Sequence, residues 1–239
     1  MAITDNLIAY WRLEEASGQR NDSHGSLHLT DTNTVSSASG KVGTCASFAQ
    51  VNSEALVRPG DDAELSLSAD QAFTIQAWVS LASLATMVVL SKDEESEPNS
   101  EYQLQYDDSV NRFVFFVWDA SAALNIVQSF GQATSVDTWY HVICGHDPAN
   151  DVLFLSVNNV SLHTDPHTGG TRDTGATFRL GATQAAGFRW NGLMDEVAFW
   201  KRVLTTDEIT WLYNAGNGRS YADLAPSASP MWERVSLDY

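Results

Sequence analysis

Basic side chains are scarce in this sequence: its 239 residues include 13 Lys and Arg against 30 Asp and Glu, a formal net charge of −17. A surface this acidic repels phosphate groups, which argues against nucleic acid as a partner. Long apolar runs are also lacking, and no stretch approaches the roughly 20 apolar residues that cross a bilayer. We therefore expect neither nucleic-acid binding nor membrane insertion.

Cysteine is equally sparse, with Cys45 and Cys144 the only two. Each lies in an apolar, strand-like run, so we expect buried free thiols, while a disulfide between them stays open. The sequence contains no C-x-x-C, H-E-x-x-H, G-x-S-x-G or phosphate-binding glycine motif. His141 and His146 flank Cys144, and we interpret this as coincidence because Cys144 is in phase with the apolar Val142.

What the sequence does contain is a regular alternation of apolar and polar residues. Strand-like runs occupy 7–13, 73–79, 102–106, 113–118, 152–157, 178–180 and 193–200. The runs at 113–118 and 152–157 are almost continuously apolar, as expected for strands covered on both faces. Many strands without interleaved helices predict an all-β fold, an antiparallel two-sheet β-sandwich or jelly roll.

Two local signals refine this picture. Asn158 and Asn159 separate the runs 153–157 and 160–163, which predicts a tight hairpin because Asn tolerates positive φ. Thr205 and Glu208 are spaced as a capping box, so a short helix should follow and end near Gly216.

Several segments, in this order, resemble the laminin-G-like domain of the concanavalin A-like lectin/glucanase superfamily. They are 10–14 (YWRLE), 17–23, 72–79 (AFTIQAWV), 138–142 (TWYHV), 157–160 (VNNV), 178–181 (FRLG), 191–197 (NGLMDEV) and 204–214. The resemblance implies a jelly roll of two antiparallel sheets. With the short C-terminal helix, the domain should span residues 1–218, and the change of composition after Gly218 indicates a linker and apolar tail at 219–239. It implies less about function, since this fold carries lectins, adhesion domains, modules of enzymes and virion proteins.

Asp195 is the most informative acidic residue, because it is in phase with Leu193, Val197 and Phe199, which should face inward. A buried carboxylate needs a counter-charge or several donors. Members of the family often hold a structural calcium near this strand, with an acidic residue from the early loop. The resemblance therefore implies Asp22 and Asp195 as metal residues and calcium as the one cofactor. The alternative is that Asp195 pairs with an Arg or with backbone N–H groups and that Asp22 forms a turn.

Four residues are candidates for ligand binding. Trp118 and Asp119 end a strand at a predicted rim, where an aromatic face beside a carboxylate suits a sugar ring. Asp93 opens an acidic loop, and Tyr102 lies across that loop. The alternative is that the aromatic residues fill the core and the loop is simply solvated.

No catalytic residue is predicted, and we expect a protein that is not an enzyme. Glycosidases of the same broad fold carry paired carboxylates alternating with apolar residues on one strand. This sequence has no such strand, because Glu95 and Glu97 lie in a loop beside a proline. A glycoside hydrolase that uses these two residues is the distant alternative.

Two functions remain open. The chain is either a secreted or cell-surface carbohydrate-binding module, or a decoration or adhesion protein on a virion or similar particle that binds a glycan or protein surface. The first residues carry no signal-peptide pattern, which favours the particle and a homo-oligomer or larger assembly. The tail would supply the anchor through its apolar residues Met231, Trp232, Val235, Leu237 and Tyr239.

Overall fold

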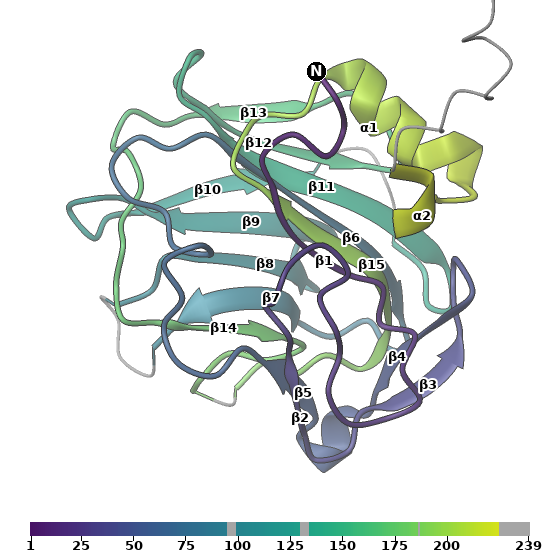
Figure 1. The fold of residues 1–239 in the computed structure, drawn as a ribbon. Helices are drawn as coiled ribbons and strands as arrows, with labels where there is room; N and C mark the ends of the chain where they lie inside the picture. The colour runs from purple at the N-terminus through teal and green to yellow at the C-terminus, as the bar shows by residue number, and fades with distance from the viewer. Residues whose placement is uncertain (95–98, 130–133, 186, 225–239) are drawn as a thin grey trace, which may run out of the picture.

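The computed structural model describes residues 1–94, 99–129, 134–185 and 187–224. In these ranges the chain forms two antiparallel sheets packed face to face, with two short α-helices at the C-terminal end (Figure 1). The predicted all-β jelly roll is confirmed. No helix in the described ranges has the length and apolar character needed to cross a membrane.

The first sheet has eight strands in the order β13-β12-β11-β6-β15-β4-β3, with β1 paired to β15. They are β1 (Leu7–Trp11), β3 (Ser36–Ser39), β4 (Thr44–Phe48), β6 (Phe73–Leu81), β11 (Trp139–Asp147), β12 (Val152–Val157), β13 (His163–Pro166) and β15 (Gly192–Trp200).

The second sheet has seven strands in the order β10-β9-β8-β7-β14-β5-β2. They are β2 (Thr30–Thr32), β5 (Ala55–Val57), β7 (Met87–Asp93), β8 (Tyr102–Asp107), β9 (Arg112–Trp118), β10 (Leu124–Gln128) and β14 (Thr177–Leu180). Tyr102, Leu104 and Tyr106 of β8 lie in the core between the sheets. Because side chains alternate along a strand, Gln103 and Gln105 lie on the outer face of this sheet.

The turn predicted at Asn158 and Asn159 is present, with φ angles of 53° and 56°, but the two strands are joined by residues 158–162 rather than by a two-residue hairpin. Its second strand begins later than predicted, at His163 rather than Val160. The apolar side chains of Val160 and Leu162 had indicated a strand here. Both residues are 46% exposed and lie on the surface before β13 begins.

The predicted helix is α1 (Thr206–Tyr213), and both hydrogen bonds of the capping box between Thr205 and Glu208 are present. It ends at Asn214, which adopts φ 49°, and continues as the 3₁₀ turn η2 (Asn214–Gly216). A one-turn helix α2 (Tyr221–Leu224) follows, and the remaining turn is η1 (Gln50–Asn52). Both α-helices cover the outer face of the eight-stranded sheet through a second apolar cluster that includes Tyr10, Trp200 and Leu212 (Figure 1).

Cys45 and Cys144 are both buried and both free, which confirms the expected thiols. Burial raises the pKa of Cys45 to about 12.

Candidate functional site

A hollow of ≈ 270 Å³ opens on the outer face of the seven-stranded sheet. It lies over β7, β8, β9 and β10, on the sheet that the C-terminal helices leave uncovered. Its lining residues are Asp93, Glu94, Ser100, Gln103, Gln105, Phe116, Trp118, Leu124, Thr183, Ala185, Gly187 and Phe188. Half of them come from these four strands, and the others come from the β7–β8 loop and the loop before β15.

Aromatic side chains form much of the hollow. Phe116 and Trp118 lie on the same face of β9, with ring centroids 6.3 Å apart and planes at 27°. Phe188 is 48% exposed, and its carbonyl accepts from Val88 N at 3.0 Å, which ties its loop to the edge of β7. The hollow therefore offers flat apolar faces that are already held in place.

Polar groups of the hollow are partly paired among themselves. Gln103 Nε2 donates to Gln105 Oε1 at 2.7 Å, which leaves the Gln103 carbonyl and the Gln105 amino group for a ligand. Asp93 accepts from Ser91 Oγ at 2.6 Å and from Gln184 N at 3.0 Å. Burial raises the pKa of Asp93 above its usual value, although these donors oppose the shift.

The charge of the hollow is one-sided. Asp93 and Glu94 line it, and none of the lining residues that the structure describes is basic. Glu94 accepts from Asn99 Nδ2 at 3.0 Å. Arg179 lies behind Asp93, with 3.7 Å between its Nη1 and Asp93 Oδ1, and is not among the lining residues. The site is thus suited to neutral rather than anionic ligands.

Two of the four predicted ligand residues, Trp118 and Asp93, line this hollow. The placement of the other two is corrected by the structure. Tyr102 is fully buried in the core and its hydroxyl donates to Leu65 O at 2.9 Å. Asp119 closes the turn after β9, where its Oδ1 accepts from Ser121 N and Ala123 N at 2.8 and 2.9 Å.

Several lining residues were missed by sequence reasoning, most notably Phe116, Gln103 and Gln105. A signal existed for Gln103 and Gln105, since they alternate with apolar residues along the predicted strand 102–106. Phe116 lies in the run 113–118, which was predicted to be covered on both faces. Phe188 lies in a loop, and no pattern in the sequence marks it.

Asp22 of the predicted metal pair is held by backbone donors. Its Oδ1 accepts from Tyr10 N and His24 N, both at 2.9 Å, and its Oδ2 accepts from Leu27 N at 3.1 Å. This is the geometry of the turn alternative. Binding of calcium by Asp22 and Asp195 stays a prediction, and the structure does not test it.

Asp195 lies on the opposite face of β15 from the one predicted. A β-bulge between Asp195 and Ala198 changes the phase, so Met194 and Val197 enter the core and Asp195 pairs in register with Trp78. Asp195 is nevertheless fully buried, because the turn at Gly40 covers it and Val42 N donates to its Oδ2 at 2.8 Å.

Glu196 occupies the bulge itself, with φ 49°, and is also fully buried. Burial is the main cause that raises the pKa of Asp195 to about 7 and the pKa of Glu196 to about 8. The neighbouring charge of Asp195 adds to the shift at Glu196, while Tyr10 opposes it.

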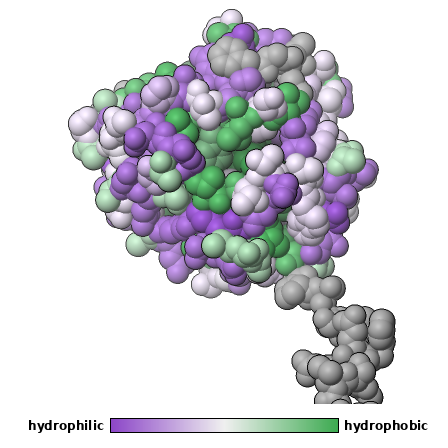
Figure 2. Space-filling view, turned by 90° about the horizontal axis from the view of Figure 1, so that it is seen from above, coloured by the Kyte–Doolittle hydropathy of each residue, from purple (hydrophilic) through white to green (hydrophobic). Residues whose placement is uncertain are grey.

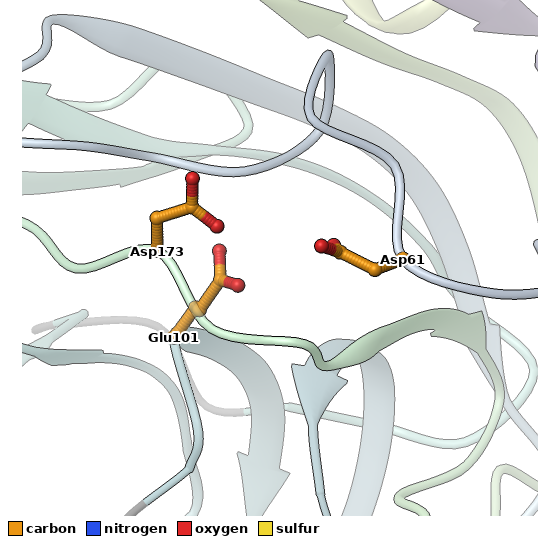
Figure 3. A group of neighbouring side chains, drawn as sticks. All are labelled: Asp61, Glu101 and Asp173. Carbon is orange, nitrogen blue, oxygen red and sulfur yellow. The ribbon is translucent and has the colours of Figure 1, made fainter.

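A third acidic group consists of Asp61, Glu101 and Asp173, whose carboxylates point toward one another from separate segments (Figure 3). Their ligand atoms lie within 4.8 Å of one another. The fully buried Lys92 already supplies a cation here, because its Nζ donates to Asp61 Oδ1, Glu101 Oε1 and Ala176 O at 2.9, 2.7 and 2.8 Å. An ammonium group has three donors, so this lysine is fully satisfied and a metal ion is not needed.

A smaller hollow of ≈ 240 Å³ lies between the N-terminus and α1, lined by Met1, Ile3, Asp207, Glu208 and Trp211. Figure 2 looks at the molecule from this side and shows hydrophobic residues around a hollowed area, with hydrophilic residues about them. Glu208 is already engaged by Arg202 at 2.7 Å. The hollow over the seven-stranded sheet has more polar groups available and is the stronger candidate.

Two antiparallel sheets with an open, aromatic-lined hollow define a lectin-type β-sandwich. A family model described as the concanavalin A-like lectin/glucanases superfamily matches residues 52–210, more than half of the chain. The chain belongs to this family, which confirms the resemblance drawn from its motifs. No curated protein matches the sequence.

Solved structures share the fold at low sequence identity. The binding domain of Paraclostridial mosquitocidal protein 1 superposes with a TM-score of 0.72 at 13% identity, over 89% of this chain and 53% of that one. Domain 4 of AbnA, an extracellular GH43 arabinanase from Geobacillus stearothermophilus solved with arabinotriose, gives 0.65 at 17%, over 90% and 98%. The binding domain of botulinum neurotoxin DC in complex with SialylT gives 0.61 at 12%, over 90% and 52%. The chain thus spans about half of the toxin domains and nearly all of the arabinanase domain.

Proposed function

We propose that the protein is a non-catalytic binding module whose hollow on the seven-stranded sheet holds a neutral carbohydrate. The observation that carries this proposal is the placement of Phe116 and Trp118 next to the paired amides of Gln103 and Gln105. A sugar ring has an apolar face that suits an aromatic side chain, and hydroxyl groups that suit amides and carboxylates.

The solved neighbours supply candidate ligands for the test. One was solved with arabinotriose and another with SialylT. The acidic lining of the hollow favours the first kind, because Asp93 and Glu94 would repel the carboxylate of a sialylated glycan.

The arrangement of the carboxylates supports a role without catalysis. Ser91 and Gln184 donate to Asp93, and Asn99 donates to Glu94, so each carboxylate already accepts hydrogen bonds from the protein itself. Glycosidases need two carboxylates opposed across the scissile bond. Glu95 and Glu97, the residues of the hydrolase alternative, lie outside the described residues.

Trp118→Ala is expected to weaken carbohydrate binding by roughly 30-fold, which corresponds to about 2 kcal/mol for the loss of a central aromatic contact. Arabinotriose, other neutral oligosaccharides and sialylated glycans would be screened on an array, and hits measured by isothermal titration calorimetry.

Leu162→Ala is the matched control, since Leu162 is 46% exposed on the β12–β13 turn and does not line the hollow. Absence of any carbohydrate binding would contradict the proposal. So would a glycan that binds the Trp118→Ala and Leu162→Ala proteins equally well. Binding to a protein surface that Trp118→Ala abolishes would keep the site and change its ligand.

A location on a virion or other particle is a further proposal, and it depends on residues 225–239, which include Met231, Trp232, Val235, Leu237 and Tyr239 and lie outside the described residues. A chain that stops at Leu224 is expected to keep its melting temperature, because Leu224 is buried in the second apolar cluster. The same chain should lose assembly in sedimentation velocity. An unchanged sedimentation coefficient for an assembled species would rule out the tail as anchor.

A further inference from the structure

Two loops of the eight-stranded sheet meet beside the end of β11. One precedes β6 and contains Asp70 and Gln71, and the other follows β13 and contains His167. Thr171 joins them, since its Oγ1 donates to Ala69 O at 2.8 Å and the two residues form an isolated β-bridge. His146, near the end of β11, lies against this junction.

The protonation of both imidazoles follows from their hydrogen bonds. His146 Nδ1 lies 3.0 Å from Gln71 O, and His167 Nε2 lies 2.7 Å from Gly170 O. A carbonyl oxygen only accepts, so each of these nitrogens carries the hydrogen. In a neutral imidazole the other nitrogen carries a bare lone pair, here His146 Nε2 and His167 Nδ1.

These two lone pairs meet no donor. Both nitrogens are buried and have no hydrogen-bond partner among the described residues, and the rings lie 4.9 Å apart at 82°. Asp70 Oδ1 lies 3.6 Å from His146 Nε2, which is too far for a hydrogen bond. His146 Nε2 and Asp70 Oδ1 thus form a close pair of electron-pair donors, with the unpaired His167 Nδ1 on the adjoining ring, and leaving buried lone pairs unpaired costs free energy. A metal ion satisfies several lone pairs at once, which one proton cannot do.

We propose that Asp70, His146 and His167 form a binding site for a divalent transition-metal ion of the zinc type. Imidazole nitrogen and carboxylate oxygen are ordinary zinc ligands, whereas calcium prefers oxygen alone. Metal-binding histidines usually donate their second N–H to a carbonyl or carboxylate, as both of these rings do. The site is separate from the calcium pair predicted at Asp22 and Asp195.

The ligand atoms of Asp70, His146 and His167 do not all lie within 4.8 Å of one another, so metal binding requires the site to rearrange. Among the described residues, only Asp61, Glu101 and Asp173 have three ligand atoms that all lie within 4.8 Å of one another. Asp70 is the ligand with room to move, because its side chain is 59% exposed while those of the histidines are buried. Its exposure also provides the path by which an ion and a water ligand can enter.

Zinc binding to the full chain, freed of any histidine tag and stripped of metals, would be measured by isothermal titration calorimetry and thermal melting. We expect one zinc ion per chain and a raised melting temperature. Asp70→Asn should weaken the zinc affinity by roughly tenfold or more, since mutating even the residues that hydrogen-bond to metal ligands has an effect of this size. Because Asp70 is exposed, this variant should fold normally, and His167→Gln should give the same loss.

Asp207→Asn and Asp173→Asn are matched controls, one on α1 and one in the Lys92 group, and both should bind zinc like the parent. Imidazole ¹⁵N spectra give a second measurement: without metal, His146 should be protonated on Nδ1 and His167 on Nε2, and zinc should shift the two bare nitrogens. Three results would overturn the proposal. They are the absence of saturable zinc binding, zinc binding that Asp173→Asn weakens and Asp70→Asn does not, and histidine tautomers opposite to those expected.

Discussion

Lys92→Met is expected to destabilise the fold by about 3–5 kcal/mol, because removing one partner of a buried ion pair leaves an uncompensated charge. Lys92 and Glu101 are both fully buried as side chains and lie 2.7 Å apart. Glu101 Oε1 would keep only its bonds from Thr174, whose N and Oγ1 donate at 2.9 and 3.0 Å. Urea denaturation followed by circular dichroism measures the loss, which is a large part of the 5–15 kcal/mol typical of a domain.

Lys201→Met provides the control, since the ammonium of Lys201 makes a single exposed hydrogen bond within the described part of the chain, to Ala63 O at 3.2 Å. Its effect should stay within about 0.5 kcal/mol. The double variant Lys92→Met with Glu101→Leu removes both charges and should recover much of the loss. If Lys92→Met were no more destabilising than Lys201→Met, the lysine would not be the cation that satisfies this acidic group.

Stability is expected to fall by about 2 kcal/mol as the pH rises from 6.5 to 8, at about 1.36 kcal/mol per pH unit for a group that is protonated only when folded. Burial raises the folded pKa values of Asp195 and Glu196 to about 7 and about 8. In this window the unfolded chain has lost both protons and the folded chain still holds part of them. Each step up in pH therefore favours unfolding until the folded pKa values are passed.

The predicted fall in stability applies only above pH 6.5, because buried histidines act in the opposite direction at lower pH. Burial lowers the pKa of His141 to about 3 and also lowers that of His146, so below the ordinary histidine value these two groups destabilise the fold as the pH falls. They therefore oppose the carboxyl groups at lower pH. Glu196→Gln should remove most of the slope between pH 6.5 and 8 in urea titrations with EDTA present. A parent protein whose stability is flat in this range would show that Glu196 is ionised when folded.

Much of the fold was predictable because its strands obey a period of two. The inner faces are filled by alternating apolar residues, and the capping box at Thr205 and Glu208 marks the helix. Asp195 shows where this reasoning fails. The bulge adds one residue to β15, which changes the face of the sheet toward which Asp195 points relative to Val197 and Phe199. It requires a positive φ at Glu196, and a glutamate in the sequence does not indicate a positive φ.

The candidate sites were predictable only in part. Trp118 and Asp93 line the hollow from a strand end and the start of an acidic loop, although they are only 6% and 5% exposed. Tyr102 was misplaced, although its own alternation with Leu104 put it in the core. His146 and His167 come together only through the pairing of β11, β12 and β13 and the loop that follows. Such long-range contacts leave no local pattern in the sequence.

The two buried thiols can be used to measure the local unfolding of this protein. Cys45 and Cys144 are both free and without exposed surface, and burial raises both thiol pKa values. Because alkylating reagents attack the thiolate, modification at neutral pH requires each strand to open first. The labelling rates of Cys45 on β4 and Cys144 on β11 would therefore time the opening of a peripheral and a central strand of one sheet, with no engineered probe.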